Sequence, residues 1–217
     1  MKMKLIIILT LILLALGALP CSASTFSDMI GNDMEAIVDS LAAEGVIYGV
    51  TETTFNPNGK VTRAEFSAMI VRAMGYEEAD YQNYFSDVSA DDWFAGSVAT
   101  LSQRGIINGY DNAFYPNDYI TNEQMAKIMV CLFEAECGPI RYQGGWATFM
   151  QDYYSISLWA RDYVNKAVMI NGVRTLEAPK DVVALFKPQN DAIRSAAAEV
   201  IYNVRNTIRV VNQQKGE

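Results

Sequence analysis

Two arginines lie at positions that favour the binding of a carboxylate. Arg63 directly follows Thr62 at the expected N-terminus of a helix, and Arg194 holds the matching place in a later segment. A guanidinium can bind a carboxylate through two parallel hydrogen bonds. Backbone N–H groups and the dipole at a helix N-terminus also favour anions. Both residues could therefore bind an acidic ligand, but their position and chemistry alone do not rank this role of Arg63 above a surface salt bridge.

Several kinds of catalysis are excluded by the residues present. The sequence contains no histidine, so it has no Ser-His-Asp or Cys-His nucleophile and no imidazole ligand for zinc. Asp91 and Asp92 are adjacent, but neighbours on a helix point in different directions. Glycosidases need two carboxyls facing each other at about 5 to 9 Å. Asp111 and Asp118 do not have the spacing of a calcium-binding EF-hand. We expect no catalytic residue, metal or cofactor.

The charge balance argues against nucleic acid as a partner. The 217 residues include 17 basic and 25 acidic side chains, a net charge of −8. Residues 24–140 hold 5 basic and 18 acidic side chains, a balance of −13, whereas residues 141–217 hold 10 and 7, a balance of +3. A polyphosphate requires a positive face. An anionic ligand would find the last third the more favourable surface, unless the difference is ordinary surface variation.

The N-terminal segment, from Met1 to Ala23, has the three parts of a secretory signal peptide. Two lysines precede an apolar run over residues 5–19, and small residues follow up to Ser24. The run is shorter than the roughly 20 residues that span a bilayer, which leaves an uncleaved anchor as the weaker alternative. Lipid modification of Cys21 is a third reading, although Pro20 fits that processing poorly. We expect cleavage after Ala23, secretion, and no membrane association thereafter.

Two stretches of the chain match at a series of positions that keep the same order and nearly the same spacing. Each has a Phe-Ser-Asp opening, a Gly-aliphatic-aliphatic-x-Gly turn, a Phe-x-Pro loop and a Thr-x-x-Glu/Gln capping box. The matching segments are Phe26–Asp28, Gly45–Gly49, Phe55–Pro57 and Thr62–Glu65 in the first copy, and Phe85–Asp87, Gly105–Gly109, Phe114–Pro116 and Thr121–Gln124 in the second. Such self-similarity indicates tandem repeats.

A third, more divergent copy follows. It opens at Trp159, which matches Trp93, and continues through Ile170–Gly172, Phe186–Pro188 and Ala192–Arg194. The interval from Trp159 to Gly172 is shorter than the interval from Trp93 to Gly109. We therefore expect its first helix to be shorter by about one turn. The longer stretch between Gly172 and Phe186 predicts an insertion in a surface loop.

Each copy is predicted to form a helix, a loop and a second helix. In the second copy, Ser89–Asp92 resembles a capping box that opens the first helix, and Gly105 is expected to end it. The second helices open at Thr62 and Thr121. Their expected buried stripes are Phe66, Met69, Ile70 and Ala73 in the first copy, and Met125, Ile128, Met129 and Leu132 in the second.

Cys131 and Cys137 would both enter an oxidising compartment, where a disulfide can form. A helix that ends near Glu134 would allow the bond. A helix that continues through Cys137 would place the two thiols on different faces and keep them apart.

The ordered elements of these repeats resemble the S-layer homology motif. Three such motifs, from Phe26 to Arg209, resemble one complete module of that family. The resemblance implies an all-α fold in which three repeats (24–80, 81–140 and the divergent 141–209) form a pseudo-threefold, three-pronged module around a central helical bundle, followed by a polar tail (210–217). It also implies non-covalent attachment to secondary cell-wall polysaccharide, often pyruvylated, of a Gram-positive-type wall. Other surface proteins are further candidate partners.

The same resemblance nominates site residues. In the family, ligand grooves lie between neighbouring prongs, and the arginine of the Thr-Arg-Ala-Glu element is a principal contact. Asn122 replaces this arginine in the second copy, and Asp33 replaces the family's tryptophan in the first. For both remaining tryptophans we expect core packing to be the larger role. The candidate polysaccharide-binding residues are Arg63, Arg194, Trp93, Trp159, Asp87 and Asn122. The replacements leave open a second hypothesis, a degenerate module that assembles with other proteins and binds no glycan.

Overall fold

The computed structural model describes residues 24–141, 145–171 and 185–216. The predicted signal peptide, with its cleavage site and Cys21, lies outside these residues, as does most of the predicted insertion before Phe186. Three short helices alternate with three longer ones: α2 (Glu35–Ala43), α3 (Arg63–Met74), α4 (Ala95–Gln103), α5 (Asn122–Cys137), α6 (Arg161–Met169) and α7 (Arg194–Lys215). Three 3-10 helices are η1 (Ser27–Met29), η2 (Trp146–Phe149) and η3 (Tyr153–Ser155). The described ranges contain no strand, and the predicted all-α class is confirmed.

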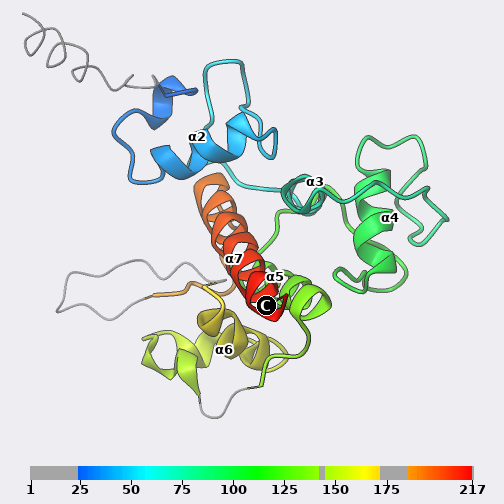
Figure 1. The fold of residues 1–217 in the computed structure, drawn as a ribbon. Coiled ribbons are helices and arrows are strands. Elements are labelled where there is room, and N and C mark those ends of the chain that lie inside the picture. The colour runs from blue at the N-terminus through cyan, green and yellow to red at the C-terminus, as the bar shows by residue number, and fades with distance from the viewer. Residues whose placement is uncertain (1–23, 142–144, 172–184, 217) are drawn as a thin grey trace, which may run out of the picture.

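The long helices form the centre and the short helices form three prongs around it (Figure 1). Helix α7 packs against both α3 and α5. Each short helix packs against the long helix of the preceding repeat, α4 on α3 and α6 on α5, and α2 packs on α7. Because α7 belongs to the last repeat and α2 to the first, the contact between them closes the three repeats into a ring. The predicted three-pronged arrangement is confirmed.

A triangle of backbone hydrogen bonds lies where the three repeats meet. Val61 N–H donates to Ala192 O (3.1 Å), Ala192 N–H to Ile120 O (2.8 Å) and Ile120 N–H to Val61 O (3.0 Å). All three side chains are fully buried. Each repeat thus gives one hydrogen bond and receives one, which satisfies buried backbone groups that no single repeat could satisfy alone.

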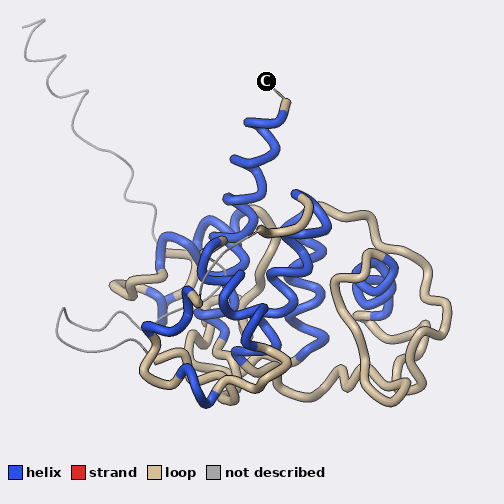
Figure 2. The backbone as a smooth tube through the Cα atoms, turned by 90° about the horizontal axis from the view of Figure 1, so that it is seen from below, coloured by secondary structure: helices blue, strands red, loops and turns tan. Residues whose placement is uncertain are grey.

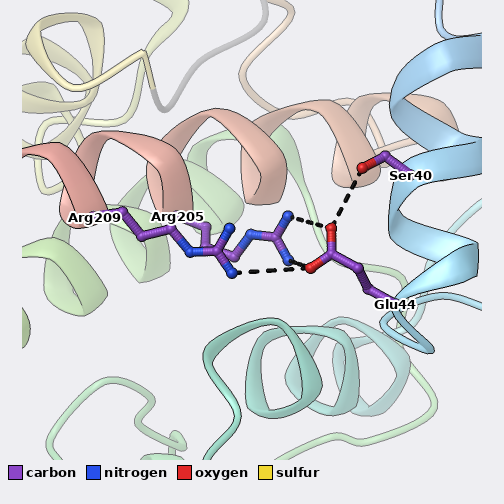
Figure 3. Close-up of polar contacts among 4 residues, drawn as sticks. All are labelled: Ser40, Glu44, Arg205 and Arg209. Atoms are coloured by element: carbon purple, nitrogen blue, oxygen red, sulfur yellow. Dashed lines mark hydrogen bonds and ion pairs between the residues drawn. The ribbon is translucent and has the colours of Figure 1, made fainter.

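An ion pair ties the first prong to α7 at a second point (Figure 3). Arg205, only 3% exposed, donates through both Nη atoms to the Glu44 carboxylate, at 2.8 and 3.0 Å. Ser40 Oγ donates to the same carboxylate at 3.3 Å, and Arg209 lies 3.9 Å from it. The hydrogen bond from Arg205 is the main cause that lowers the pKa of Glu44.

The long helices begin much as the sequence predicts. Reciprocal capping boxes are present at Thr62 with Glu65 and at Thr121 with Gln124, while Ile193 provides no side-chain cap for α7. All eight residues of the two predicted stripes are buried. Helix α7 continues through Lys215, so most of the predicted polar tail is helical, and Figure 2 shows this end projecting beyond the bundle.

Two predictions about the short helices are wrong. Helix α4 begins at Ala95 and not after Ser89, because the Asp92 carboxylate accepts the Ser89 amide (2.8 Å) to form a separate turn. Helix α6 has nine residues, as α2 and α4 do, so no turn is lost. Asn171, at φ 55°, occupies the left-handed position that Gly105 occupies in the second repeat at φ 69°. Asparagine is the other residue that tolerates this conformation. The predicted match of Gly172 with Gly109 is therefore out of register, because Asn171 corresponds to Gly105.

The two cysteines follow the second of the alternatives given above. Helix α5 runs through Cys137, and both thiols are free. Six residues of helix separate them by about 9 Å along the axis and place them on different faces. In the described ranges no helix is both long and apolar enough to cross a membrane.

Candidate functional site

Arg63 uses part of its guanidinium to hold the loop of the next repeat. Its Nε–H donates to Phe114 O (2.8 Å) and Nη2 donates to Asn108 O (3.1 Å). The guanidinium carbon lies 4.7 Å from the centre of the Phe114 ring. These bonds use two of the five N–H donors of an arginine, and the other three have no partner in the described part of the chain. The side chain therefore supports the fold and can still donate to a ligand.

Arg194 repeats this geometry at the first repeat. Its Nε–H donates to Phe55 O (2.8 Å), Nη2 donates to Tyr48 O (2.6 Å), and the Phe55 ring lies 4.8 Å away. Burial lowers the pKa of both guanidinium groups, and nearby carboxylates partly oppose the shift. Arginine stays charged through shifts of this kind, so each site keeps a cation.

The first amides of the long helices bind loop carbonyls. Arg63 N–H donates to Asp118 O (2.9 Å) and Ala64 N–H to Pro116 O (3.0 Å). The same pair of bonds recurs from Asn122 and Glu123 to Asn190 and Pro188, and from Arg194 and Ser195 to Gly59 and Pro57. The expectation that these amides favour an anion is therefore wrong, because they are already occupied. The guanidinium is the cationic group available at the starts of α3 and α7, whereas α5 starts at the uncharged Asn122.

Arg63 lines a groove of about 370 Å³, the Trp159 groove. Its walls combine Arg63 from the first repeat, Tyr110 and Lys127 from the second, and Trp159 from the third. Lys127 Nζ lies 5.8 Å from the centre of the Trp159 ring. One groove thus draws on all three repeats.

Arg194 lines a second groove of about 250 Å³, the Trp93 groove. Its walls combine Arg194 from the third repeat, Tyr48 and Arg72 from the first, and Trp93 from the second. The cyclic order of contributions is the same as in the Trp159 groove, and each contribution comes from the preceding repeat of the ring. The guanidinium of Arg72 lies 4.8 Å from the Tyr48 ring, whereas in the Trp159 groove the second cation lies beside the tryptophan.

Both tryptophans are exposed on groove walls and are not part of the core. Trp93 is 61% exposed and Trp159 is 49% exposed. The residues that follow them, Phe94 and Ala160, are buried instead. The prediction that core packing is their larger role is wrong, because the residue after each tryptophan fills the core position at the start of the prong helix.

A sequence model of the S-layer homology domain matches the chain at two tandem positions, residues 25–67 and 84–126. Helices α6 and α7 repeat the same arrangement a third time. The chain belongs to the S-layer homology family.

Relatives of this S-layer homology module carry diverse names. The chain is 36% identical to an amylopullulanase of Thermoanaerobacterium thermosulfurigenes over 83% of its own length and 9% of the relative. It is 36% identical to the exoglucanase XynX of Acetivibrio thermocellus, over 83% of the chain and 16% of the relative. It is 35% identical to a surface-layer 125 kDa protein of Lysinibacillus sphaericus, over 68% of the chain and 12% of the relative. The chain thus spans less than a fifth of these relatives.

The two positions of the S-layer homology module where arginine and tryptophan are replaced would belong to one and the same groove. A third groove would take its helix-start residue from the second repeat and its aromatic residue from the first. Those positions hold Asn122 and the exposed Asp33. Asn122 Nδ2 donates to Phe186 O (3.2 Å) and Lys187 O (3.0 Å), so it keeps the loop contact of an arginine without its charge. The other two grooves are each complete in arginine and tryptophan.

Asp87 holds the backbone of the loop that Arg63 contacts. Its two carboxylate oxygens accept the amides of Phe114 and Tyr115, both at 2.7 Å. Tyr115 has a left-handed backbone, φ 59°, which the second of these bonds stabilises. Asp87 therefore shapes the groove through its loop.

Asp28 and Asp152 do the same in the other two repeats of the module. Asp152 accepts the amides of Phe186 (3.0 Å) and Lys187 (2.6 Å). Sequence reasoning missed Asp152 because Met150 and Gln151 replace the Phe-Ser that marks its equivalents. The distance of 34 residues to Phe186, against 27 in the other repeats, also hid the match. In the described residues, no cluster of three or more cysteine or acidic side chains could hold a metal ion.

Proposed function

We propose that this chain is a non-catalytic anchoring module that binds secondary cell-wall polysaccharide at the cell surface. The observation that carries the proposal is the pairing, in two separate grooves, of an arginine that keeps three N–H donors with an exposed tryptophan. A guanidinium suits a carboxylate such as that of a pyruvate ketal. An exposed indole offers an apolar face on which a sugar ring can stack.

The relatives support an attachment role. Their names include enzymes, a surface-layer protein and a middle cell wall protein of Brevibacillus brevis. The matched segment is a small part of each. A common means of attachment to the cell surface is what such dissimilar proteins would share, and the predicted signal peptide would deliver this chain there.

A second candidate function is a scaffold that binds proteins and no glycan. The replacement of arginine by Asn122 and of tryptophan by Asp33 at the third groove position favours it. The ring geometry limits this argument, since both losses fall on one groove and two complete grooves remain.

Sedimentation with purified cell-wall sacculi tests the proposal. The exported chain, expected to begin at Ser24, is mixed with sacculi before and after chemical removal of the secondary polymer. We expect binding that depends on the polymer. Binding that persists after its removal would overturn the polysaccharide assignment, and absence of binding to either sample would support the scaffold.

Variants of the two tryptophans give the site-specific arm. Arg63 and Arg194 also hold the ring together, so their removal would confuse binding with folding. Trp93→Ala and Trp159→Ala remove exposed side chains, and we expect each to weaken sedimentation and the double variant to abolish it. Tyr154→Ala is the matched control, because this aromatic residue is 84% exposed on the third prong and lines neither groove. Equal loss in the control would contradict the groove assignment.

A further inference from the structure

A carboxylate is buried beside the Trp159 groove. Glu123, the second residue of α5, is only 5% exposed. Its Oε2 accepts the Ser157 amide at 3.0 Å and its Oε1 accepts the Ser157 hydroxyl at 2.7 Å. Glutamate is seldom buried unless its charge is satisfied by partners. Here both of these partners belong to one residue of the third prong, so the carboxylate fixes that residue to the central bundle.

The residue that Glu123 holds begins the turn that carries Trp159. Ala160 N–H donates to Ser157 O at 2.8 Å, which closes the turn, and α6 starts at the next residue. Trp159 lies within this turn with half of its side chain exposed. The direction of an exposed indole depends on the backbone that carries it, so the anchored turn determines how Trp159 faces the groove.

The corresponding turn in the second prong is held in a different way. There the Asp92 carboxylate, directly before Trp93, accepts the Ser89 amide within the prong itself. In the third prong the position of Asp92 is Leu158, and in α3 the position of Glu123 is Ala64. The third prong thus has no carboxylate at the position of Asp92, and a carboxylate of the central helix binds its turn instead, two residues nearer the tryptophan.

We propose that Glu123 is a positioning residue for the Trp159 groove, where it holds the tryptophan in the orientation that stacks on a glycan ring. The proposal rests on the glycan-binding function proposed above. It assigns to a buried residue outside the groove lining a role in affinity that is independent of its contribution to stability.

The test uses a background in which Trp159 is the remaining tryptophan, Trp93→Phe with Trp146→Phe. Time-resolved fluorescence anisotropy then reports the motion of Trp159 without any ligand, and sedimentation with sacculi reports binding through the Trp159 groove. We expect Glu123→Ala to add a fast anisotropy component and to weaken binding about tenfold, which corresponds to about 1.4 kcal/mol. Glu123→Gln should preserve both signals, since an amide can accept from the Ser157 N–H and donate to its hydroxyl.

Asn165→Ala is the matched control. Asn165 is also 5% exposed; its side chain accepts from the Ala147 amide of the same prong at 2.8 Å and donates to Arg161 O at 2.9 Å, and neither bond is made to residues 157–160 of the Trp159 turn. We expect it to lower stability while leaving the anisotropy and binding unchanged. If Glu123→Ala does not fold, as judged by circular dichroism, Ser157→Ala removes only the hydroxyl bond and should produce smaller changes of the same kind.

Two results would overturn the inference. One is an unchanged Trp159 anisotropy in folded Glu123→Ala, or in Ser157→Ala where that replaces it. The other is a more mobile Trp159 with undiminished binding. If neither the parent chain nor the background protein binds sacculi while the anisotropy responds as expected, the glycan-binding proposal fails and the anchoring of the turn by Glu123 stands.

Discussion

Replacement of Glu44 by alanine should destabilise the protein through the charge that it leaves behind. Arg205 is 3% exposed, and both of its Nη groups bind the Glu44 carboxylate. Without that carboxylate the guanidinium would remain buried on α7, and in the described part of the chain no other carboxylate forms an ion pair with it. Breaking a fully buried ion pair from one side costs about 3 to 5 kcal/mol.

The expected magnitude is smaller because one partner reaches solvent. The Glu44 side chain is 40% exposed, so water can enter the space it vacates and solvate part of the guanidinium. We therefore expect a loss of about 2 kcal/mol in the free energy of unfolding. For a chain of this size that corresponds to a melting temperature about 4 to 8 °C lower.

Urea unfolding followed by circular dichroism measures this effect, and a double variant separates its cause. Arg205→Met together with Glu44→Ala removes the stranded charge and fills similar volume with apolar atoms. We expect the double variant to be more stable than Glu44→Ala alone and within about 1 kcal/mol of the parent chain. A double variant as unstable as the sum of both single changes would refute the reasoning.

Two further outcomes are expected. Asp152→Ala removes the acceptor of two amides, one of them that of Lys187 at φ 52°. It should lower the free energy of unfolding in urea by about 2 to 3 kcal/mol, and Asp152→Asn should lower it by roughly half as much. Equal stability of the parent chain and the alanine variant would contradict this role. The hydrogen bond from Arg205 lowers the pKa of Glu44, so the unfolded chain binds the proton first as the pH falls. The stabilisation is therefore complete above the ordinary glutamate pKa of about 4.3 and is lost as the pH drops through the lower folded value. Between pH 6 and pH 3 the free energy of unfolding should decrease less steeply in Glu44→Gln than in the parent chain. Identical slopes would show that this ion pair does not contribute to the pH dependence of stability.

Local signals in the sequence predicted the helix boundaries where nearby residues determine them. The capping boxes at Thr62 and Thr121 and the left-handed Gly105 depend on residues within three or four positions. The same kind of pattern misled at Ser89, where the carboxylate closes a turn and the buried Phe94 determines where α4 starts. Asn171 was missed because only its backbone conformation reveals that it replaces a glycine.

The composition of the grooves could not be predicted by comparing the copies one at a time. When the copies are compared separately, arginine and tryptophan occur together only in the third, which suggested a degenerate module. In the ring, each groove takes its arginine from one repeat and its tryptophan from another. Glu123 and Ser157, 34 residues apart, and Glu44 and Arg205, 161 residues apart, meet only because α2 and α6 pack on the long helix of a different repeat.

The packing of α7 has a mechanical consequence. The helix contacts α2, α3 and α5 along its length, its N-terminal residues adjoin the hydrogen-bonded triangle, and its C-terminal end projects from the opposite end of the bundle (Figure 2). A pull applied at that end acts along the helix axis, so the three interfaces are sheared together and do not peel apart one after another. The grooves adjoin the start of the long helices, at the other end. Tension between a polymer bound in the grooves and the C-terminus would therefore act along the bundle, in the direction in which the contacts of α7 with α2, α3 and α5 must break together.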